Sequence, residues 1–446
     1  MSRAWAAAFA GAAILSAIVM WGFTVDDALI SIRYARHLAS GIGYRFDAGG
    51  PSTDGVTPLP WPFVIAPLAF GGAFDVLVRV KVLGIALHAT SAALLARVNA
   101  PSRARVASVV LLAACLPFAA YGSSGMETPL ATLLCTIAVV FAERRWAALV
   151  AGLAATVRPE LAPWAVTIAC GFALARRAPP KDVVLAFALG AAPFATCAII
   201  RRVAFGRFAP LALMAKPSDV SHGVVYAAAA LLACGLPLLL LTTTLRRVPG
   251  PAKVVAVAFG VHVLAVIVAG GDSMAYARLF VPLVPPLLFV HLHSANIACG
   301  PLFWLRSACA LGLAAWIFAG PGLDGRHVMR DRADLVARAR PIIAGAKHVA
   351  AVDIGWVSAC TEGDIVDLAG LTDPEIAALH GGHTSKRVDA SMLLDRKVDL
   401  VVLWSDHEIS WQLTRDRLFV SRYALETTLP LGRGSYGVFR LRPSAD

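Results

Sequence analysis

The chain has 446 residues, of which 58% are hydrophobic and only 15% are charged. Soluble domains carry about 25% charged residues, so this composition excludes an ordinary soluble protein and indicates an integral membrane protein. The formal net charge is +12, but the basic residues fall in small clusters between apolar runs, as in cytoplasmic loops. This distribution argues against nucleic acid as a partner.

The first apolar run, Ala4 to Phe23, is long enough to cross a bilayer, which takes about 20 residues. It is too long for the apolar core of a typical signal peptide, so we interpret it as a retained helix. Two carboxylates, Asp26 and Asp27, follow where the chain leaves this run. Because charge near the hydrocarbon is unfavourable, such a pair often marks a functional site.

The residues after the acidic pair have the pattern of an amphipathic helix on the membrane surface, ending at Gly41 and Gly43. Tyr34 lies on the same face as Asp27. A loop from Asp47 to Pro60 then carries a third carboxylate, Asp54. The apolar stripe of the helix consists of Ala28, Ile32, Ala35 and Ala39, and the side chains expected to point away from it are Arg33, Arg36 and His37. A plain connector, whose acids only favour the helix N-terminus, is the alternative interpretation.

With Arg3 taken as cytoplasmic, the positive-inside rule predicts about 11 transmembrane helices, with the amino terminus inside and the tail outside. The first external loop covers 24–77, and within it Trp61 to Phe74 has the pattern of an interfacial or re-entrant segment. The later spans are expected at 78–96, 106–121, from the GSSGMETP turn to Phe141, and at 146–157, 159–175, 183–200, 231–244, 254–269, 279–292 and 302–318.

The tail differs in composition, because its charges are scattered among short apolar runs. HVAAVDIG and VDLVVLW have the pattern of buried strands, and ADLVARARPII and PEIAALH have that of helices. We therefore predict a mainly α protein with a transmembrane domain at 1–320 and an external α/β domain at 321–446. The tail contains no G-x-G-x-x-G or P-loop pattern, so nothing in it indicates nucleotide binding.

Polar residues that a membrane does not favour gather at the predicted external ends of the helices. The apolar run before Arg158 has only about twelve residues, so its guanidinium is expected below the headgroups, where it favours an anion. Each of these residues also has an ordinary explanation, such as a helix cap or an ion pair, but their common side favours a site. They are Glu127, Arg158, Glu160, Lys216, Asp272 and Arg278.

The eight cysteines show no CxxC or Cys/His spacing of the kind that binds metal ions. Seven of them lie in or beside apolar runs, and only Cys360 lies in the polar tail. We therefore expect neither a metal ion nor a cofactor.

Several stretches occur in an order similar to that of the GT-C class of polytopic glycosyltransferases, and the chain most resembles the cell-wall arabinofuranosyltransferases that add terminal residues to arabinan. The resemblance runs from Asp26 to about Ile376. It departs from the family pattern at Asp54, where the family has a glutamate before Gly-Tyr-Thr, and at Leu161, where the family usually has glycine. The stretches are DDALISIRYARHLASGIGYRF, DGVTPLPW, SGMETPL, VRPEL, AGGDSMAYARLFVPLVPP and DLAGLTDPEIA.

The resemblance implies a sugar transferase with a polyprenyl-phosphate-linked donor and an external active site. An acidic residue of the first external loop, Asp27 or its neighbour Asp26, would take the proton of the acceptor hydroxyl, and direct displacement would invert the anomeric configuration. The candidates for stabilising the donor phosphate are Arg158, Lys216 and Arg278. The candidates for binding substrate are Tyr34, Asp54, Glu127, Glu160 and Asp272.

The expected partners are the lipid-linked donor, a glycan or other envelope acceptor, and the lipids of the cell (inner) membrane. Arabinofuranose is the sugar that the resemblance suggests, and mannose or another hexose is equally compatible with the chemistry. A carrier or flippase for a lipid-linked or anionic solute is the alternative, although such proteins show internal pseudo-symmetry and interrupted helices at the bilayer midplane. A structural scaffold is a third interpretation.

Overall fold

The structure, a computed structural model, describes residues 2–216, 218–235, 248–295 and 300–443. Within these ranges the protein is mainly helical, with a small sheet near the carboxyl end. Ser102–Ala114 and Leu116–Gly122 form a helix pair bent by 63°, which would count as one further membrane span. Four helices are long and apolar enough to cross a membrane: Ala73–Arg97, Pro180–Phe205, Gly250–Ala269 and Pro301–Ala319.

The other apolar helices of the described residues are shorter than the about 20 residues that a span needs. They are Arg3–Val19, Thr128–Val140, Ala147–Val157, Pro159–Ala175, Val220–Cys234 and Val281–Ala295. The expected number of about 11 spans therefore stays a prediction. The span expected at 231–244 lies mostly outside the described residues, and the helix before it begins at Val220, because the Asp219 carboxylate caps it by accepting the N–H groups of Ser221 and His222.

The chain divides into two compact units. The first consists of Met1–Thr24, Val80–Ala198 and Ser218–His327, and the second of Val25–Arg79, Ile199–Pro217 and Val328–Asp446. The tail thus shares a unit with the first loop, an association that the sequence analysis did not anticipate.

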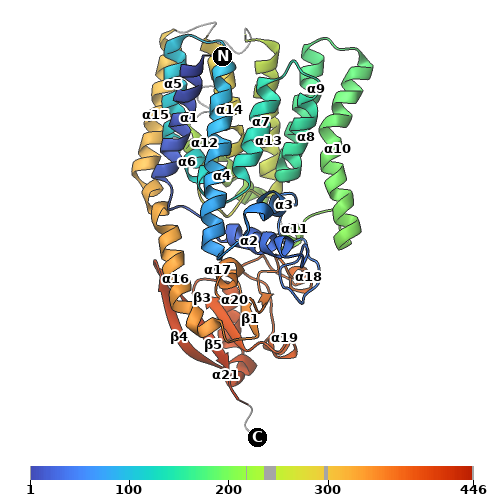
Figure 1. Ribbon diagram of the computed structural model, residues 1–446, viewed down its shortest axis with the longest axis vertical. Helices are drawn as coiled ribbons and strands as arrows, with labels where there is room; N and C mark the ends of the chain where they lie inside the picture. Colours follow the sequence, from blue (N-terminus) through green and yellow to red (C-terminus); the bar gives the residue numbers. More distant parts are fainter. Residues whose placement is uncertain (1, 217, 236–247, 296–299, 444–446) are drawn as a thin grey trace. The chain divides into compact units, whose positions relative to one another are not determined.

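The first unit is a helix bundle. Figure 1 shows α7 (Thr128–Val140), α8 (Ala147–Val157), α9 (Ala162–Ala175) and α13 (Gly250–Ala269) side by side, and they are in contact in that order. The other elements that lie wholly or mostly in this unit are α1 (Arg3–Val19), α4 (Ala73–Leu94), η2 (Leu95–Arg97), α5 (Ser102–Ala114), α6 (Leu116–Gly122), η3 (Pro159–Leu161), α10 (Pro180–Phe205), α12 (Val220–Cys234), η6 (Val281–Leu283), α14 (Val284–Ala295), α15 (Pro301–Ala319) and η7 (Pro321–His327).

Apolar side chains cover the outer faces of the long helices of this bundle. Only 17% of the most apolar window of α10 and 22% of that of α15 is buried. Faces of this kind are rare on water-soluble proteins and compatible with a membrane protein. The exposed apolar residues include Val184, Phe187, Val257, Leu264, Val268, Leu305 and Trp316.

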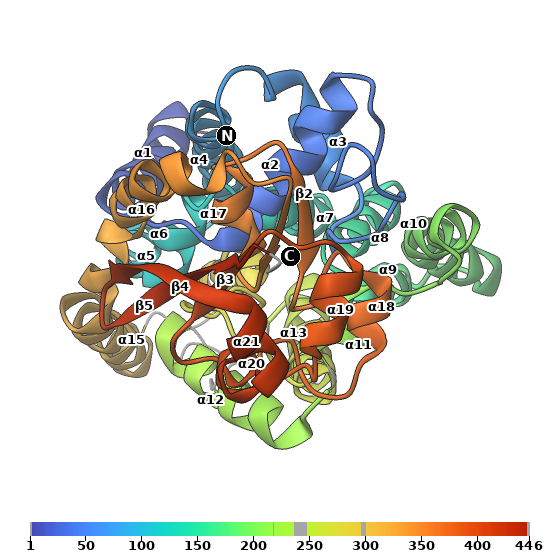
Figure 2. The same cartoon turned by 90° about the horizontal axis from the view of Figure 1, so that it is seen from below.

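The second unit contains a five-stranded sheet with the strand order β2-β1-β3-β5-β4. β1 (His348–Ala351) pairs in parallel with β2 (Asp364–Asp367) and β3 (Leu400–Trp404), whereas β5 (Gly434–Leu441) is antiparallel to β3 and to β4 (Tyr423–Leu431). Figure 2 shows α16 and α17 on one side of this sheet and α20 and α21 on the other. The remaining elements of the unit are α2 (Asp26–Ala39), α3 (Trp61–Ile65), η1 (Ala66–Leu68), α11 (Ala212–Ala215), α16 (Val328–Ile343), α17 (Ile354–Ser358), α18 (Pro374–Ala378), α19 (Ala390–Asp395), α20 (Glu408–Arg415) and α21 (Arg417–Arg422).

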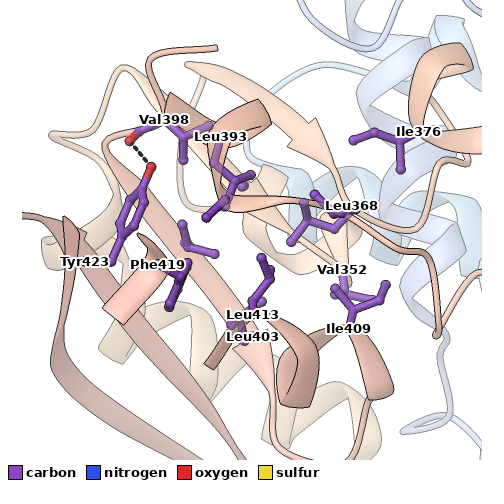
Figure 3. Close-up of a cluster of buried hydrophobic side chains, with 14 of the residues drawn as sticks. Val352, Leu368, Ile376, Leu393, Val398, Leu403, Ile409, Leu413, Phe419 and Tyr423 are labelled. Atoms are coloured by element: carbon purple, nitrogen blue, oxygen red, sulfur yellow. Dashed lines mark hydrogen bonds between the residues drawn. The ribbon is translucent and has the colours of Figure 1, made fainter. Parts of the chain in front are cut away.

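An apolar core lies between the sheet and the helices α19 to α21 (Figure 3). Tyr423 closes its edge: the ring is 2% exposed, and its hydroxyl donates a hydrogen bond of 3.0 Å to the carbonyl oxygen of Val398. The predicted strands β1 and β3 and the predicted helices α16 and α18 are confirmed. Helices on both faces explain why β1 and β3 read as continuous apolar runs.

The helix expected to lie on the membrane surface, α2, is instead buried along most of its length. Arg33 is 2% exposed, and its guanidinium donates to Asp47 at 3.0 Å and to the carbonyl oxygens of Thr361 and Gly363 at 2.9 and 2.8 Å. Arg33, which the sequence places on the side away from the apolar stripe, is therefore buried against the tail rather than exposed. The tail thus supplies hydrogen-bond acceptors for this polar side of the helix.

Candidate functional site

Buried charges form a network at one place in the helix bundle. The Arg158 guanidinium donates to Glu127 at 2.7 Å and to Glu160 at 2.6 Å. The side chain of Arg158 is 4% exposed and that of Glu127 is fully buried. Because isolated charges are strongly disfavoured in such surroundings, the carboxylates compensate for the burial of this arginine.

The local sequence explains how the network is assembled. Glu127 stands directly before α7, and Arg158 ends α8 in an extended conformation because Pro159 follows it. The short helix η3 then places Glu160 beside the same guanidinium. The motifs SGMETPL and VRPEL, which are 31 residues apart at their charged positions, therefore meet in one network.

A second ion pair belongs to the same cluster. Arg278 donates to Asp272 at 2.8 Å, and their side chains are 10% and 6% exposed. The charges of both residues act on the guanidinium of Arg158. Five predicted site residues are thus brought together inside the first unit.

The cluster holds three carboxylates and two guanidiniums, and its hydrogen-bonding capacity is only partly used. Arg158 has five N–H donors, and its two ion pairs use only two of them. The second carboxylate oxygen of Glu127 is buried and has no hydrogen-bond partner among the described residues. A buried acceptor without a donor indicates a position that a hydroxyl group or a water molecule fills.

The other five predicted site residues, Asp26, Asp27, Tyr34, Asp54 and Lys216, lie in the second unit. Asp26 is the most constrained of them. Its carboxylate accepts the backbone N–H groups of Gly355 at 2.7 Å and Trp356 at 2.9 Å, and the Arg332 guanidinium at 3.3 Å. Asp26 therefore joins α2 to the first turn of α17. A Cβ at Gly355 would lie 2.2 Å from the Asp26 carbonyl oxygen, so this contact requires glycine.

Burial dominates the ionisation of Asp26. It raises the pKa of this carboxyl from 3.8 to about 6, against the Arg332 charge, which lowers it. Asp353 adds to the increase, and its own carboxylate accepts the hydroxyl of Tyr436. Asp27, the next residue, is partly buried.

Tyr34 holds the loop that follows α2. The ring is fully buried, and its hydroxyl is 3.0 Å from the carbonyl oxygen of Thr53 and accepts the N–H of Gly55 at 3.3 Å. The hydroxyl is thus engaged with the backbone of the predicted loop motif, which makes Tyr34 a positioning residue in this structure.

Asp54 forms a buried ion pair that the sequence did not predict. One of its oxygens accepts Arg201 Nε at 2.7 Å, and both side chains are at most 4% exposed. The other oxygen has no hydrogen-bond partner among the described residues. The only signal for Arg201 was its place directly after the apolar run 183–200. Lys216 follows α11 and is partly buried.

Of three comparisons with known proteins, one found a match, and this match covers only the tail. Residues 334–439 match a family described as "Domain of unknown function (DUF8728)". No curated protein and no solved structure matches the chain. The tail, from α16 to β5, is therefore similar to that family, and the match does not reach the helix bundle.

Proposed function

We propose that the protein is a membrane glycosyltransferase that moves a sugar from a polyprenyl-phosphate donor to a glycan or similar acceptor of the cell envelope. The observation that carries the proposal is the buried network of Glu127, Arg158 and Glu160 in a bundle with apolar outer faces. Buried charges in such a bundle mark a functional site more often than a structural one. The resemblance of the sequence motifs to GT-C enzymes supplies the reaction class.

The proposed reaction is a direct displacement. The acceptor oxygen attacks the anomeric carbon, the bond from that carbon to the phosphate oxygen breaks, and the electron pair leaves with the polyprenyl phosphate. Arg158 and Arg278, with Lys216 as the third candidate, stabilise the charge that the leaving phosphate gains. The configuration at the anomeric carbon is inverted.

Asp27 is the proposed base. Asp26 already uses both oxygens to hold Gly355, Trp356 and Arg332, and removing those contacts to bind a substrate would leave buried donors unpaired. Asp27 carries the next carboxylate of the same motif, and the resemblance allows either residue of the pair as the base. General-base catalysis of this kind contributes about 10² to 10⁴ in rate.

The proposed setting is the cell (inner) membrane, with about 11 spans, a cytoplasmic amino terminus and the tail on the external side. This topology places the motifs SGMETPL, VRPEL and AGGDSMAYAR at the external ends of their helices. It is supported by the positive clusters between the apolar runs.

The test is a donor panel. Membranes that contain the protein are incubated with polyprenyl-phosphate-linked arabinofuranose, mannose and other hexoses, together with envelope glycans, and consumption of each donor is measured. We expect one donor to be consumed, and Asp27→Asn to reduce that rate by at least about 10² while expression and membrane insertion stay normal. Transfer at the normal rate by Asp27→Asn would exclude this base, and transport of an intact donor without transfer would favour a carrier.

Arg158 is tested with a conservative change, because Arg158→Ala would leave Glu127 and Glu160 uncompensated and destabilise the bundle by about 3–5 kcal/mol. Arg158→Lys keeps the charge but loses the planar donor geometry. We expect KM for the donor to rise about tenfold and KM for the acceptor to stay unchanged. Arg145→Lys is the control, since Arg145 is 72% exposed and forms an ion pair with Asp182 at 2.9 Å. Equal effects of the two variants on donor KM would contradict the role of Arg158.

A further inference from the structure

A groove of about 380 Å³ lies between α5 and α15 in the helix bundle. The two helices are in contact and lie side by side (Figure 1). Both belong to candidate membrane spans, so in a membrane the open side of the groove meets lipid. None of the roles proposed above uses its lining residues.

The walls of the groove are apolar. Their residues recur at steps of three and four, so each helix turns one face toward the groove. Alanine and serine in the middle of these faces leave the space that larger side chains would fill. The hydroxyl of Ser307 already donates to the carbonyl oxygen of Phe303 at 2.9 Å. The wall residues include Val106, Ala107 and Val110 of α5 and Ser307, Ala308 and Leu311 of α15.

One end of the groove carries a guanidinium and an indole, from Arg103 and Trp304. The residues next to them, Ala104 and Phe303, belong to one buried cluster, which brings the first turns of α5 and α15 together. Arg103 is exposed, and it has no ion pair within the part of the chain that the structure describes. Tryptophan and arginine at the end of a membrane helix are typical of the level of the lipid headgroups.

The charges at this end of the groove favour an anion. Arg103 and Arg105 stand near the start of α5, whose first turn contains no acidic residue. Because the amino-terminal end of a helix carries a partial positive charge, these guanidiniums are unfavourable there unless an anion lies close to them. Arg105 is engaged elsewhere, since it donates to the carbonyl oxygen of Val98 at 3.0 Å and lies over the ring of Trp5. Arg103 is therefore the cation that the groove offers to a ligand.

The dimensions of the groove select a single hydrocarbon chain. From Arg103 to Leu111 the groove follows α5 for about 12 Å, close to the depth of about 15 Å of one bilayer leaflet. Over this length its volume corresponds to a mean cross-section of about 30 Å², far below that of a helix of about 10–12 Å in diameter. An acyl chain fits, whereas a transmembrane helix of another protein is too wide to enter.

We infer that this groove binds an anionic phospholipid, with one acyl chain between α5 and α15 and the headgroup phosphate on Arg103. In the topology proposed above, Arg103 lies at the cytoplasmic end of the bundle, opposite to the external active site, so the occupant is a membrane phospholipid and not the donor. The cytoplasmic leaflet is also the one with a negative surface potential from anionic lipids. The inference does not depend on the transferase reaction, since it rests on the groove and its charge.

The experiment is native mass spectrometry of the full-length protein in detergent, which counts the bound lipids. The probes are palmitoyl-oleoyl phosphatidylglycerol and the phosphatidylcholine with the same two acyl chains. We expect phosphatidylglycerol to bind more tightly, and Arg103→Gln to reduce this preference about fivefold, the contribution of one arginine near an anionic surface. Arg144→Gln is the control, because the Arg144 side chain is 66% exposed and does not line the groove.

A second pair of variants tests the groove itself. Ala308→Phe fills the space of the acyl chain and is expected to raise the Kd for phosphatidylglycerol about tenfold, because about two methylene groups lose their contact. Cys309→Phe adds the same ring at the next position, which does not line the groove, and is expected to leave Kd unchanged. Both positions are exposed, so neither variant disturbs the core of the bundle.

Three results would overturn the lipid site: equal affinity of the unchanged protein for the two lipids, equal effects of Arg103→Gln and Arg144→Gln, or the same Kd for Ala308→Phe and Cys309→Phe. A dimer that Ala308→Phe dissociates would overturn it in favour of a second copy of the chain. Displacement of phosphatidylglycerol by an equimolar polyprenyl phosphate would overturn it in favour of the lipid carrier.

Discussion

The hydrogen-bond partners of the Asp26 carboxylate are invisible in the sequence. Asp26 and Asp27 are equivalent as residue types and adjacent in position. The structure engages Asp26 with two backbone N–H groups of α17 and with Arg332. Sequence reasoning left the choice of base open because the partner, α17, lies more than 300 residues further along the chain.

The raised pKa of Asp26 makes a prediction about stability. A carboxyl whose pKa is about 6 when folded and 3.8 when unfolded binds its proton more tightly in the folded state. Stability from this group is therefore highest below pH 3.8 and falls as pH rises through 6, by about 3 kcal/mol in all. We expect the difference in unfolding free energy between the unchanged protein and Asp26→Asn to shift by this order between pH 4 and pH 7.

The measurement is thermal unfolding in detergent at a series of pH values. Glu362→Gln serves as the control, because the Glu362 side chain is 69% exposed and its charge is not among those that shift the pKa of Asp26. Parallel pH profiles for the unchanged protein and Asp26→Asn would contradict the raised pKa.

At the scale of elements, the sequence predicted the parts that depend on local patterns. The strands β1 and β3 are apolar runs of four and five residues, and helices on both sides of the sheet make such runs easy to recognise. β4 was not predicted, because only two of its nine residues, Tyr423 and Leu429, are buried, so it has no regular apolar pattern. β2 begins and ends with an aspartate, which in a sequence indicates a turn.

The first external loop and the turn after β2 show why the motifs alone do not identify which residues contact a ligand. Asp367 and Gly370 in DLAGLTDPEIA serve the backbone: one accepts three N–H groups, and the other has a positive φ of 74°. Tyr34 likewise holds the loop at Thr53 and Gly55. A motif thus contains residues that build the turn as well as residues that face a ligand. The sequence does not distinguish these two kinds of residue, whereas the hydrogen bonds in the structure do.

At the scale of the whole molecule, composition predicted the membrane character. The division into two units depends instead on contacts between segments that are far apart in the sequence. The apolar faces of α10, α13 and α15 agree with the expected membrane spans at those positions. The association of 25–79 with the tail in one unit depends on pairs such as Arg33 with Thr361 and Gly363. A single sequence gives no signal for such pairs, because each partner is an ordinary polar group.

The predicted topology has a direct consequence for the tail. With the amino terminus inside and an odd number of spans, the residues after α15 lie on the external side. A carboxyl-terminal fusion to alkaline phosphatase, which is active only outside the cytoplasm, is expected to show activity, whereas a fusion to green fluorescent protein exported by the same route is expected to stay dark. The control fusions end after Arg145 or Arg177, at basic clusters that the same topology places inside, and should give the opposite result. A fluorescent fusion at the carboxyl end would place the tail in the cytoplasm and remove the external acceptor from the proposed reaction.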